Sequence, residues 1–144
     1  MSSAGSEILR AAAETDFDFL RGFSNEPGDA QLRTQIRDGR LRIIEPAGVP
    51  AGFIKFYVLW ETLPFMEVII LLEDRRGRGL GREAVRQWER EMAARSFTRV
   101  IISTQANETA QGFWRRIGYK DCGSLNLPDR PIELFMFRDI SGGE

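Results

Sequence analysis

Glycines and arginines are concentrated in one short segment near the middle of the chain. The segment reads Arg75-Arg76-Gly77-Arg78-Gly79-Leu80-Gly81-Arg82. Glycine lets the main chain approach an anion closely and adopt conformations that are closed to other residues. A helix that starts at such a turn presents unpaired N–H groups and a partial positive charge, and nearby arginines add charge-assisted hydrogen bonds. The segment therefore predicts a binding site for a phosphate or diphosphate group.

Other interpretations compete for this segment. A Walker loop needs Gly-Lys-Ser/Thr, and neither a lysine nor a hydroxyl side chain stands at those positions. A dinucleotide fingerprint needs Gly-x-Gly-x-x-Gly, and the glycines at 77, 79 and 81 are spaced differently. An RNA-binding arginine–glycine tract is usually repetitive, whereas this one is brief and lies between apolar segments. A turn with solvated arginines also explains the composition, so the segment alone leaves this alternative open.

The composition excludes several other kinds of chemistry. The chain has no histidine, which removes histidine bases and histidine metal ligands, and we expect no metal. Its one cysteine, Cys122, cannot form an intrachain disulfide and has no histidine to activate it, which suits a reducing cytoplasm. A formal net charge of −1 gives no general attraction to nucleic acid. No apolar run approaches the roughly 20 residues of a membrane span, so neither nucleic acid nor membrane is an expected partner.

The periodicity of the apolar residues predicts the elements around this segment. Helical spacing predicts helices over residues 14–22 and 29–37. A third predicted helix carries a single apolar stripe formed by Leu80, Ala84, Val85, Trp88 and Met92. The last predicted helix is capped by Asn107 and ended by Gly118. Strands are predicted at residues 7–11, 41–45, 52–60, 66–72, 99–104, 119–123 and 132–137. The nearly continuous apolar run at 66–72 favours a strand buried on both faces. This order predicts an α/β fold with a mixed sheet (α+β), formed by one domain over residues 1–144.

Two motifs together resemble the GNAT superfamily of N-acetyltransferases. Residues 76–81 fit the family signature Arg/Gln-x-x-Gly-x-Gly/Ala. Residues 107–119, Asn-Glu-Thr-Ala-Gln-Gly-Phe-Trp-Arg-Arg-Ile-Gly-Tyr, are similar to its second motif, Asn-x-x-Ala-x-x-Phe-Tyr-x-x-x-Gly-Phe. The motifs occur in the family's order, and the match covers roughly residues 64–123. The resemblance implies a GNAT-like acyl-CoA N-acyltransferase fold.

The resemblance also implies a substrate and the residues that bind it. Acetyl-CoA would donate an acetyl group to an amine, and the acceptor could be an antibiotic, a polyamine, an amino acid, a peptide N-terminus or a protein lysine. The CoA diphosphate would be held by main-chain amides of Arg76, Gly77, Arg78, Gly79, Leu80, Gly81 and Arg82. The pantetheine arm would lie between the strand at 66–72 and the strand at 99–104, pairing with the main chain of Ile70, Leu71 and Leu72. Asn107 matches the asparagine that contacts the CoA arm in the family.

The resemblance also implies catalytic roles, but it leaves the general acid without a matching residue. A main-chain N–H, assigned to Leu71, would stabilise the oxyanion, and Glu67 is the candidate base. Trp114 occupies the CoA-site position where many members have a tyrosine that acts as general acid, and an indole cannot supply a proton as a phenol can. An alternative is therefore a GNAT-like module that binds acyl-CoA with little or no turnover. The terminal strand at 132–137 could also pair across a homodimer.

Overall fold

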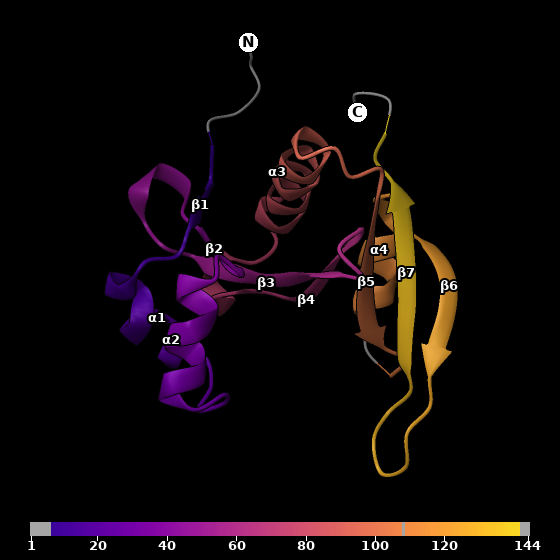
Figure 1. Cartoon of the computed structure of the whole chain (residues 1–144), viewed down its shortest axis with the longest axis horizontal. Helices are drawn as coiled ribbons and strands as arrows, with labels where there is room; N and C mark the ends of the chain where they lie inside the picture. Colours follow the sequence, from indigo (N-terminus) through magenta and orange to yellow (C-terminus); the bar gives the residue numbers. More distant parts are fainter. Residues whose placement is uncertain (1–6, 108, 142–144) are drawn as a thin grey trace. The chain divides into compact units, whose positions relative to one another are not determined.

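The computed structural model describes residues 7–107 and 109–141, in which seven strands form a mixed sheet in the order β1-β2-β3-β4-β5-β7-β6 (Figure 1). The strands are β1 (Leu9–Ala11), β2 (Leu41–Ile44), β3 (Gly52–Leu59), β4 (Leu63–Leu71), β5 (Arg99–Gln105), β6 (Lys120–Leu125) and β7 (Glu133–Asp139). The helices are α1 (Phe17–Arg21), α2 (Asp29–Arg37), α3 (Leu80–Ala94) and α4 (Ala110–Arg116), with 3-10 turns η1 (Glu14–Asp16), η2 (Pro46–Gly48) and η3 (Glu73–Arg75). This arrangement confirms the predicted α/β class with a mixed sheet.

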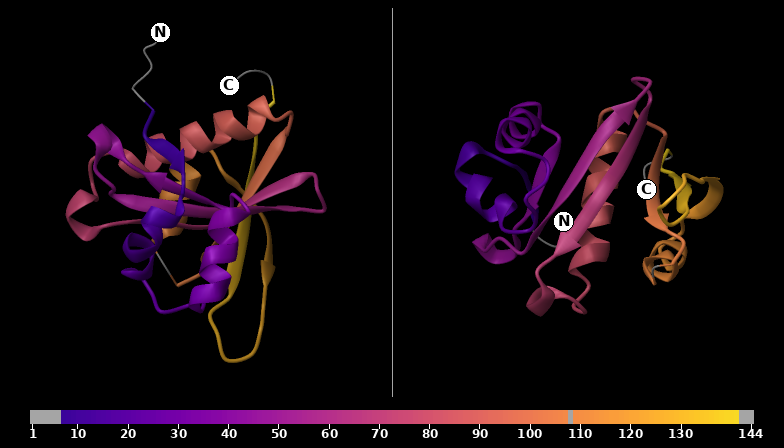
Figure 2. Two further views of the ribbon diagram at one scale, coloured as in Figure 1. Left: turned by 60° about the vertical axis from the view of Figure 1, so that its left-hand side comes forward. Right: turned by 90° about the horizontal axis from the view of Figure 1, so that it is seen from below.

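The chain divides into two compact units, and each is made of two separate segments. The described part of the first unit comprises residues 7–56 and 68–87, and that of the second comprises 57–67, 88–107 and 109–141. The first unit contains β1, β2, most of β3, the end of β4 and the start of α3. Its α1 and α2 lie on one face of β2 and β3, and the first turns of α3 lie on the other face (Figures 1 and 2).

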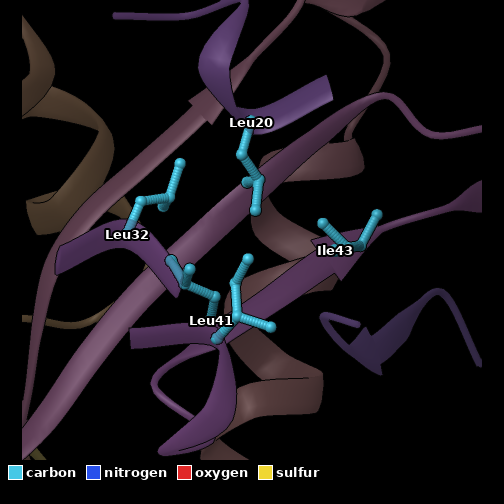
Figure 3. Close-up of a cluster of buried hydrophobic side chains, with 5 residues drawn as sticks. Leu20, Leu32, Leu41 and Ile43 are labelled. Atoms are coloured by element: carbon cyan, nitrogen blue, oxygen red, sulfur yellow. The ribbon is translucent and has the colours of Figure 1, made fainter. Parts of the chain in front are cut away.

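The α1–α2 face of the first unit is held by apolar packing. Leu32 and Ile36, one helical turn apart on α2, join Leu20 of α1 against β2, where Leu41 and Ile43 point to the same side (Figure 3). Ile44 alternates to the opposite face and is fully buried there. Hydrophobic residues thus cover both faces of β2, which fixes the register of this strand.

An ion cluster closes the edge of the first unit. The Arg10 guanidinium donates to both carboxylate oxygens of Asp16, at 2.8 Å each, and to Glu45 at 2.8 and 3.0 Å. Asp16 is buried and also accepts the Ala13 N–H at 2.8 Å. These hydrogen bonds, chiefly those from Arg10, lower the pKa of Asp16 below its usual range, and Arg10 likewise lowers the pKa of Glu45.

The second unit contains β5, β7 and β6 in antiparallel pairing, together with α4 (Figure 1). The β6–β7 loop extends past the ends of its strands (Figure 2). Within this unit β4 pairs in parallel with β5, Phe65 opposite Ile101 and Met66 opposite Ile102. Glu89 of α3 is buried, and it accepts hydrogen bonds from the Tyr119 hydroxyl at 2.6 Å and from Arg138 at 2.8 Å. This buried carboxylate therefore joins α3 to the chain around β6 and β7.

Several predicted elements are confirmed and others need correction. Helix α2 has the predicted bounds, and the apolar stripe of α3 is buried from Ala84 to Met92. The predicted helix at 14–22 is instead a 3-10 turn followed by a short α-helix. Asn107 does not cap α4, because residues 106 and 107 form a turn and Thr109 is the N-cap; the Gln111 side chain donates to the Ala106 carbonyl and holds that turn. Gly118 follows the helix in a left-handed conformation, as predicted.

Strand β4 also differs from its prediction. It begins at Leu63 rather than at residue 66, because the preceding turn is made by Trp60 and Glu61, both with positive φ, and the Thr62 N–H bonds to the Leu59 carbonyl. The strand is not buried on both faces: Glu67 is exposed, and residues 68–71 are half-buried. A continuous apolar run therefore did not indicate complete burial here.

Candidate functional site

The end of β4 is fixed by close contact with the start of β3. The Leu72 N–H donates to the Ala51 carbonyl at 2.8 Å. A Cβ atom added to Gly52 would overlap the carbonyl oxygen of Ile70 and would lie 2.9 Å from the Leu71 Cα. Only glycine permits this approach of two main chains, so residues 51 and 52 set the position of the strand end.

The chain then turns through η3 into the glycine segment. The Arg75 N–H donates to the Leu72 carbonyl at 2.9 Å, and the Arg76 side-chain Nε donates to the Leu71 carbonyl at 3.2 Å. Gly77 and Gly79 have φ values of 78° and 81°, in the left-handed region that glycine adopts readily. Leu80 begins α3. The predicted order of strand, glycine turn and helix is therefore confirmed.

The main-chain N–H groups of this turn are available to a ligand. In the part of the chain that the structure describes, the N–H groups from Gly77 to Arg82 have no main-chain partner, and the first bond of the helix runs from the Glu83 N–H to the Gly79 carbonyl at 3.1 Å. A Cβ atom added to either Gly77 or Gly79 would meet nothing within 4 Å. The turn therefore offers a row of main-chain N–H donors that neither a side chain at the glycines nor a main-chain carbonyl covers.

The charge around the turn favours an anion. Arg76, Arg78 and Arg82 are exposed beside the N–H groups. The start of α3 adds the partial positive charge of a helix of 15 residues. Glu73 and Asp74 precede the turn and are also exposed. The three arginines are thus next to the N–H groups in sequence, whereas Glu73 and Asp74 precede the turn and Glu83 is the acidic residue in the first turn of α3.

A side-chain clamp holds the first turns of α3. Gln87 is buried; its Nε2 donates to Glu83 at 2.8 Å, and its Oε1 accepts the Ile8 N–H at 2.8 Å. Ala84 and Val85 are fully buried next to it in sequence. The start of the helix is therefore anchored to the chain that leads into β1, so its N–H groups have a fixed direction.

The remaining predicted site residues belong to the second unit. Glu67 is exposed on β4, and Asn107 is exposed in the turn before α4. Trp114 is 4% exposed and packs edge-to-face against Phe113 and Tyr119, with ring centroids 5.1 and 5.0 Å apart. The structure thus collects the strand end Ile70–Leu72 and the turn at 76–82 in the first unit, while these three side chains are in the second.

Cys122 has the properties expected of a thiol without a catalytic role. It is exposed on β6, where the ladder with β7 is irregular between Asp121 and Gly123. Partial burial of the thiol raises its pKa, and the neighbouring Asp121 carboxylate raises it further. A raised pKa lowers the fraction of the thiolate, which is the nucleophilic form.

Sequence reasoning missed two residues that position this site, Gly52 and Gln87. A glycine at the start of a predicted strand is a known signal of close main-chain approach, and it could have identified Gly52. A lone glutamine at the edge of an apolar helical stripe gives no comparable signal, because most such side chains are solvated.

The comparisons with known proteins identify the class to which this mixed sheet, with its glycine turn before α3, belongs. The family model for the acetyltransferase (GNAT) family matches residues 7–119. The chain therefore belongs to the GNAT acetyltransferase family, whose members use acetyl-CoA. No curated protein matches the sequence significantly.

Solved structures share the fold at low sequence identity. Ard1 from Thermoplasma volcanium is 16% identical with a TM-score of 0.77, over 91% of this chain and 95% of that chain. An aminoglycoside 6'-N-acetyltransferase complexed with coenzyme A is 16% identical with a TM-score of 0.76, over 96% and 99%. The ribosomal-protein-S18-alanine N-acetyltransferase from Escherichia coli is 15% identical with a TM-score of 0.75, over 94% and 95%. At these identities the likeness establishes the fold alone.

In the described residues, no helix is both long and apolar enough to cross a membrane.

Proposed function

We propose that this chain is an N-acetyltransferase that transfers the acetyl group of acetyl-CoA to a primary amine. The observation that carries the proposal is the turn at 77–82, where main-chain N–H groups without main-chain partners in the described chain meet the start of α3. These N–H groups would bind the CoA diphosphate, with Arg76, Arg78 and Arg82 adding charge. Membership in the GNAT family supports the choice of CoA over other anions.

The strand end would aim the thioester. Ala51 and Gly52 hold residues 70–72 in place, so a donor at Leu71 would have a fixed direction toward the reacting carbonyl. The amine nitrogen attacks the thioester carbon, the carbonyl oxygen becomes an oxyanion that the Leu71 N–H stabilises, and the C–S bond then breaks to release the CoA thiolate. The amine loses one proton and the thiolate gains one. We assign the first proton to Glu67, an exposed carboxylate on β4, acting directly or through water.

The acceptor is proposed only as a class. The structural neighbours include proteins named for acetylating an aminoglycoside and a ribosomal-protein alanine, so the shared fold serves chemically different amines. The test is release of free CoA thiol from acetyl-CoA with a panel of an aminoglycoside, a polyamine, free amino acids, peptides with free N-termini and a lysine peptide. We expect thiol release with at least one of them. Tight CoA binding without release across the whole panel would contradict the proposed activity.

Trp114 favours a second candidate, an acyl-CoA-binding module with little turnover. Its ring is buried against Phe113 and Tyr119, which is a packing role, and it leaves the usual acid position without a phenol. The variant Trp114→Tyr discriminates between the two. We propose that water supplies the proton to the thiolate. In that case the turnover of the variant should stay within about tenfold of the wild type, which is about 1.4 kcal/mol in the barrier. A larger gain would favour the second candidate.

A further inference from the structure

A small pocket of about 40 Å³ lies between the segment that joins α1 to α2 and the strands β2 and β3. Its apolar walls include Leu20, Leu32 and Phe53, and the first two belong to the cluster in Figure 3. One water position takes roughly 10–15 Å³, so this volume accepts a group of about three non-hydrogen atoms. None of the lining residues comes from the turn at 76–82 or from β4. The pocket is therefore built from elements other than the proposed CoA site.

Gln35 is a buried polar residue in the wall of this pocket. It is 6% exposed, and its Oε1 atom has no hydrogen-bond partner within the described residues. Leu32 and Ile36, which flank Gln35 on the same helix, both belong to the apolar cluster. An apolar side chain at position 35 would avoid the cost of a buried, unpaired carbonyl. An unsatisfied buried acceptor is rare in folded proteins, and either a bound water or a donor group of a ligand would satisfy it.

Arg21 supplies the complementary donor. Its Nη1 donates to the Ser24 carbonyl at 2.9 Å, and its Nη2 lies 2.9 Å from Asp29 Oδ1 in an ion pair. Its Nε is buried and, as far as the described chain extends, has no hydrogen-bond partner. Among the described residues, the walls of the pocket thus include an acceptor without a hydrogen-bond partner, Gln35 Oε1, and a donor without one, Arg21 Nε, while Arg21 Nη2 has only its ion pair with Asp29.

The charges around the pocket narrow the class of ligand. An ammonium group is disfavoured by the cationic side chains of Arg21 and Lys55, which both line the pocket. A carboxylate would be attracted by the same two cations, but it has no hydrogen to donate to Gln35 Oε1, and Glu26 opposes it. A neutral group with one donor and one acceptor on about three atoms satisfies every one of these conditions. We propose that this pocket binds the primary carboxamide group of a small ligand, whose N–H donates to Gln35 Oε1 and whose C=O accepts from Arg21.

The proposal is tested by titrating the ¹⁵N-labelled protein with acetamide, acetate and methylammonium while recording main-chain amide shifts. We expect saturable shifts around Gln35 and Phe53 with acetamide only, with a Kd of the order of 1–10 mM for so small a probe. CoA is omitted, so the result does not depend on the acetyltransferase activity. Preferential binding of acetate or methylammonium would overturn the proposal, and so would a pocket that responds to none of the probes and holds only water.

Two variants of α2 complete the design. Gln35→Met keeps the length of the side chain and removes its carbonyl. We therefore expect the Kd for acetamide, measured from the amide shifts, to rise at least tenfold while the protein still folds. Gln31→Met, an exposed position on the same helix, is the matched control and should bind acetamide as the wild type does. Undiminished binding by Gln35→Met would contradict the assignment. If that variant did not fold, the wild-type titration would decide the question by itself.

Discussion

The replacement of Gly79 by valine separates the cost of backbone strain from the loss of the proposed ligand site. Gly79 has a φ of 81°, and a Cβ atom added there would meet no other atom within 4 Å. The substitution should therefore lower the free energy of unfolding by only the strain of a left-handed valine, about 1–2 kcal/mol. CoA binding should fall much further, because the valine side chain would project into the space through which the diphosphate reaches the N–H groups.

The expected loss of affinity follows from the hydrogen bonds at stake. Each main-chain hydrogen bond to a charged phosphate oxygen contributes about 1.5–3 kcal/mol, so the loss of two costs at least about 3 kcal/mol. That corresponds to a Kd for CoA raised by more than about 100-fold. Isothermal titration calorimetry with CoA measures this change, and urea unfolding measures the stability of the same sample.

Gly39 provides the matched control. It lies in the turn after α2 with a φ of 73°, and an added Cβ atom would again meet nothing within 4 Å. Gly39→Val should therefore lose the same 1–2 kcal/mol or so of stability while keeping wild-type affinity for CoA. The reasoning is refuted if Gly79→Val binds CoA within a few-fold of the wild type, or if Gly39→Val loses as much affinity as Gly79→Val does.

Three further variants test other parts of the account. Gly52→Ala places a methyl group against the Ile70 carbonyl, so unfolding experiments should show a loss of about 1–3 kcal/mol, together with weaker CoA binding; wild-type values for both would contradict the close approach. Asp16→Asn should cost about 2 kcal/mol at pH 7, since Arg10 loses a buried partner. Because the pKa of Asp16 is lowered in the folded state, this difference should be full above the ordinary Asp pKa of about 4 and shrink as the pH falls below it, and a constant difference would refute the ion pair. Glu67→Gln should lower kcat about 100-fold at neutral pH without changing CoA affinity, and an unchanged kcat would exclude this base.

The spacing of apolar residues and the positions of glycines predicted the elements that depend on residues close together in sequence. Helix α2 has a Leu32–Ile36 pair on one face, and the α3 stripe is fully apolar from Ala84 to Met92, so each helix buries the face that its sequence indicates. The glycine turn was equally predictable, because a left-handed φ at Gly77 and Gly79 is a local property of the residue type. Features of this kind depend on few distant contacts.

Features that depend on distant contacts were not predictable. The burial of β4 differs along its length, from buried at Phe65 and Met66 to half-buried at residues 68–71, although both stretches are apolar. The clamp from Gln87 to Ile8 spans 79 positions in sequence, and no local pattern marks either partner. Asn107 has a good capping side chain, but the hydrogen bond from Gln111 to the Ala106 carbonyl holds a turn there and delays the start of α4.

The central claim is that main-chain N–H groups of the glycine turn bind the diphosphate of CoA. The most direct measurement is the titration of ¹⁵N-labelled protein with CoA, and with pantetheine as a control without phosphate, while the amide signals of Gly77, Gly79 and Gly81 are followed. The account predicts saturable downfield proton shifts at these glycines with CoA and none with pantetheine, while Gly39 stays unchanged. CoA binding that leaves all three signals in place would contradict it.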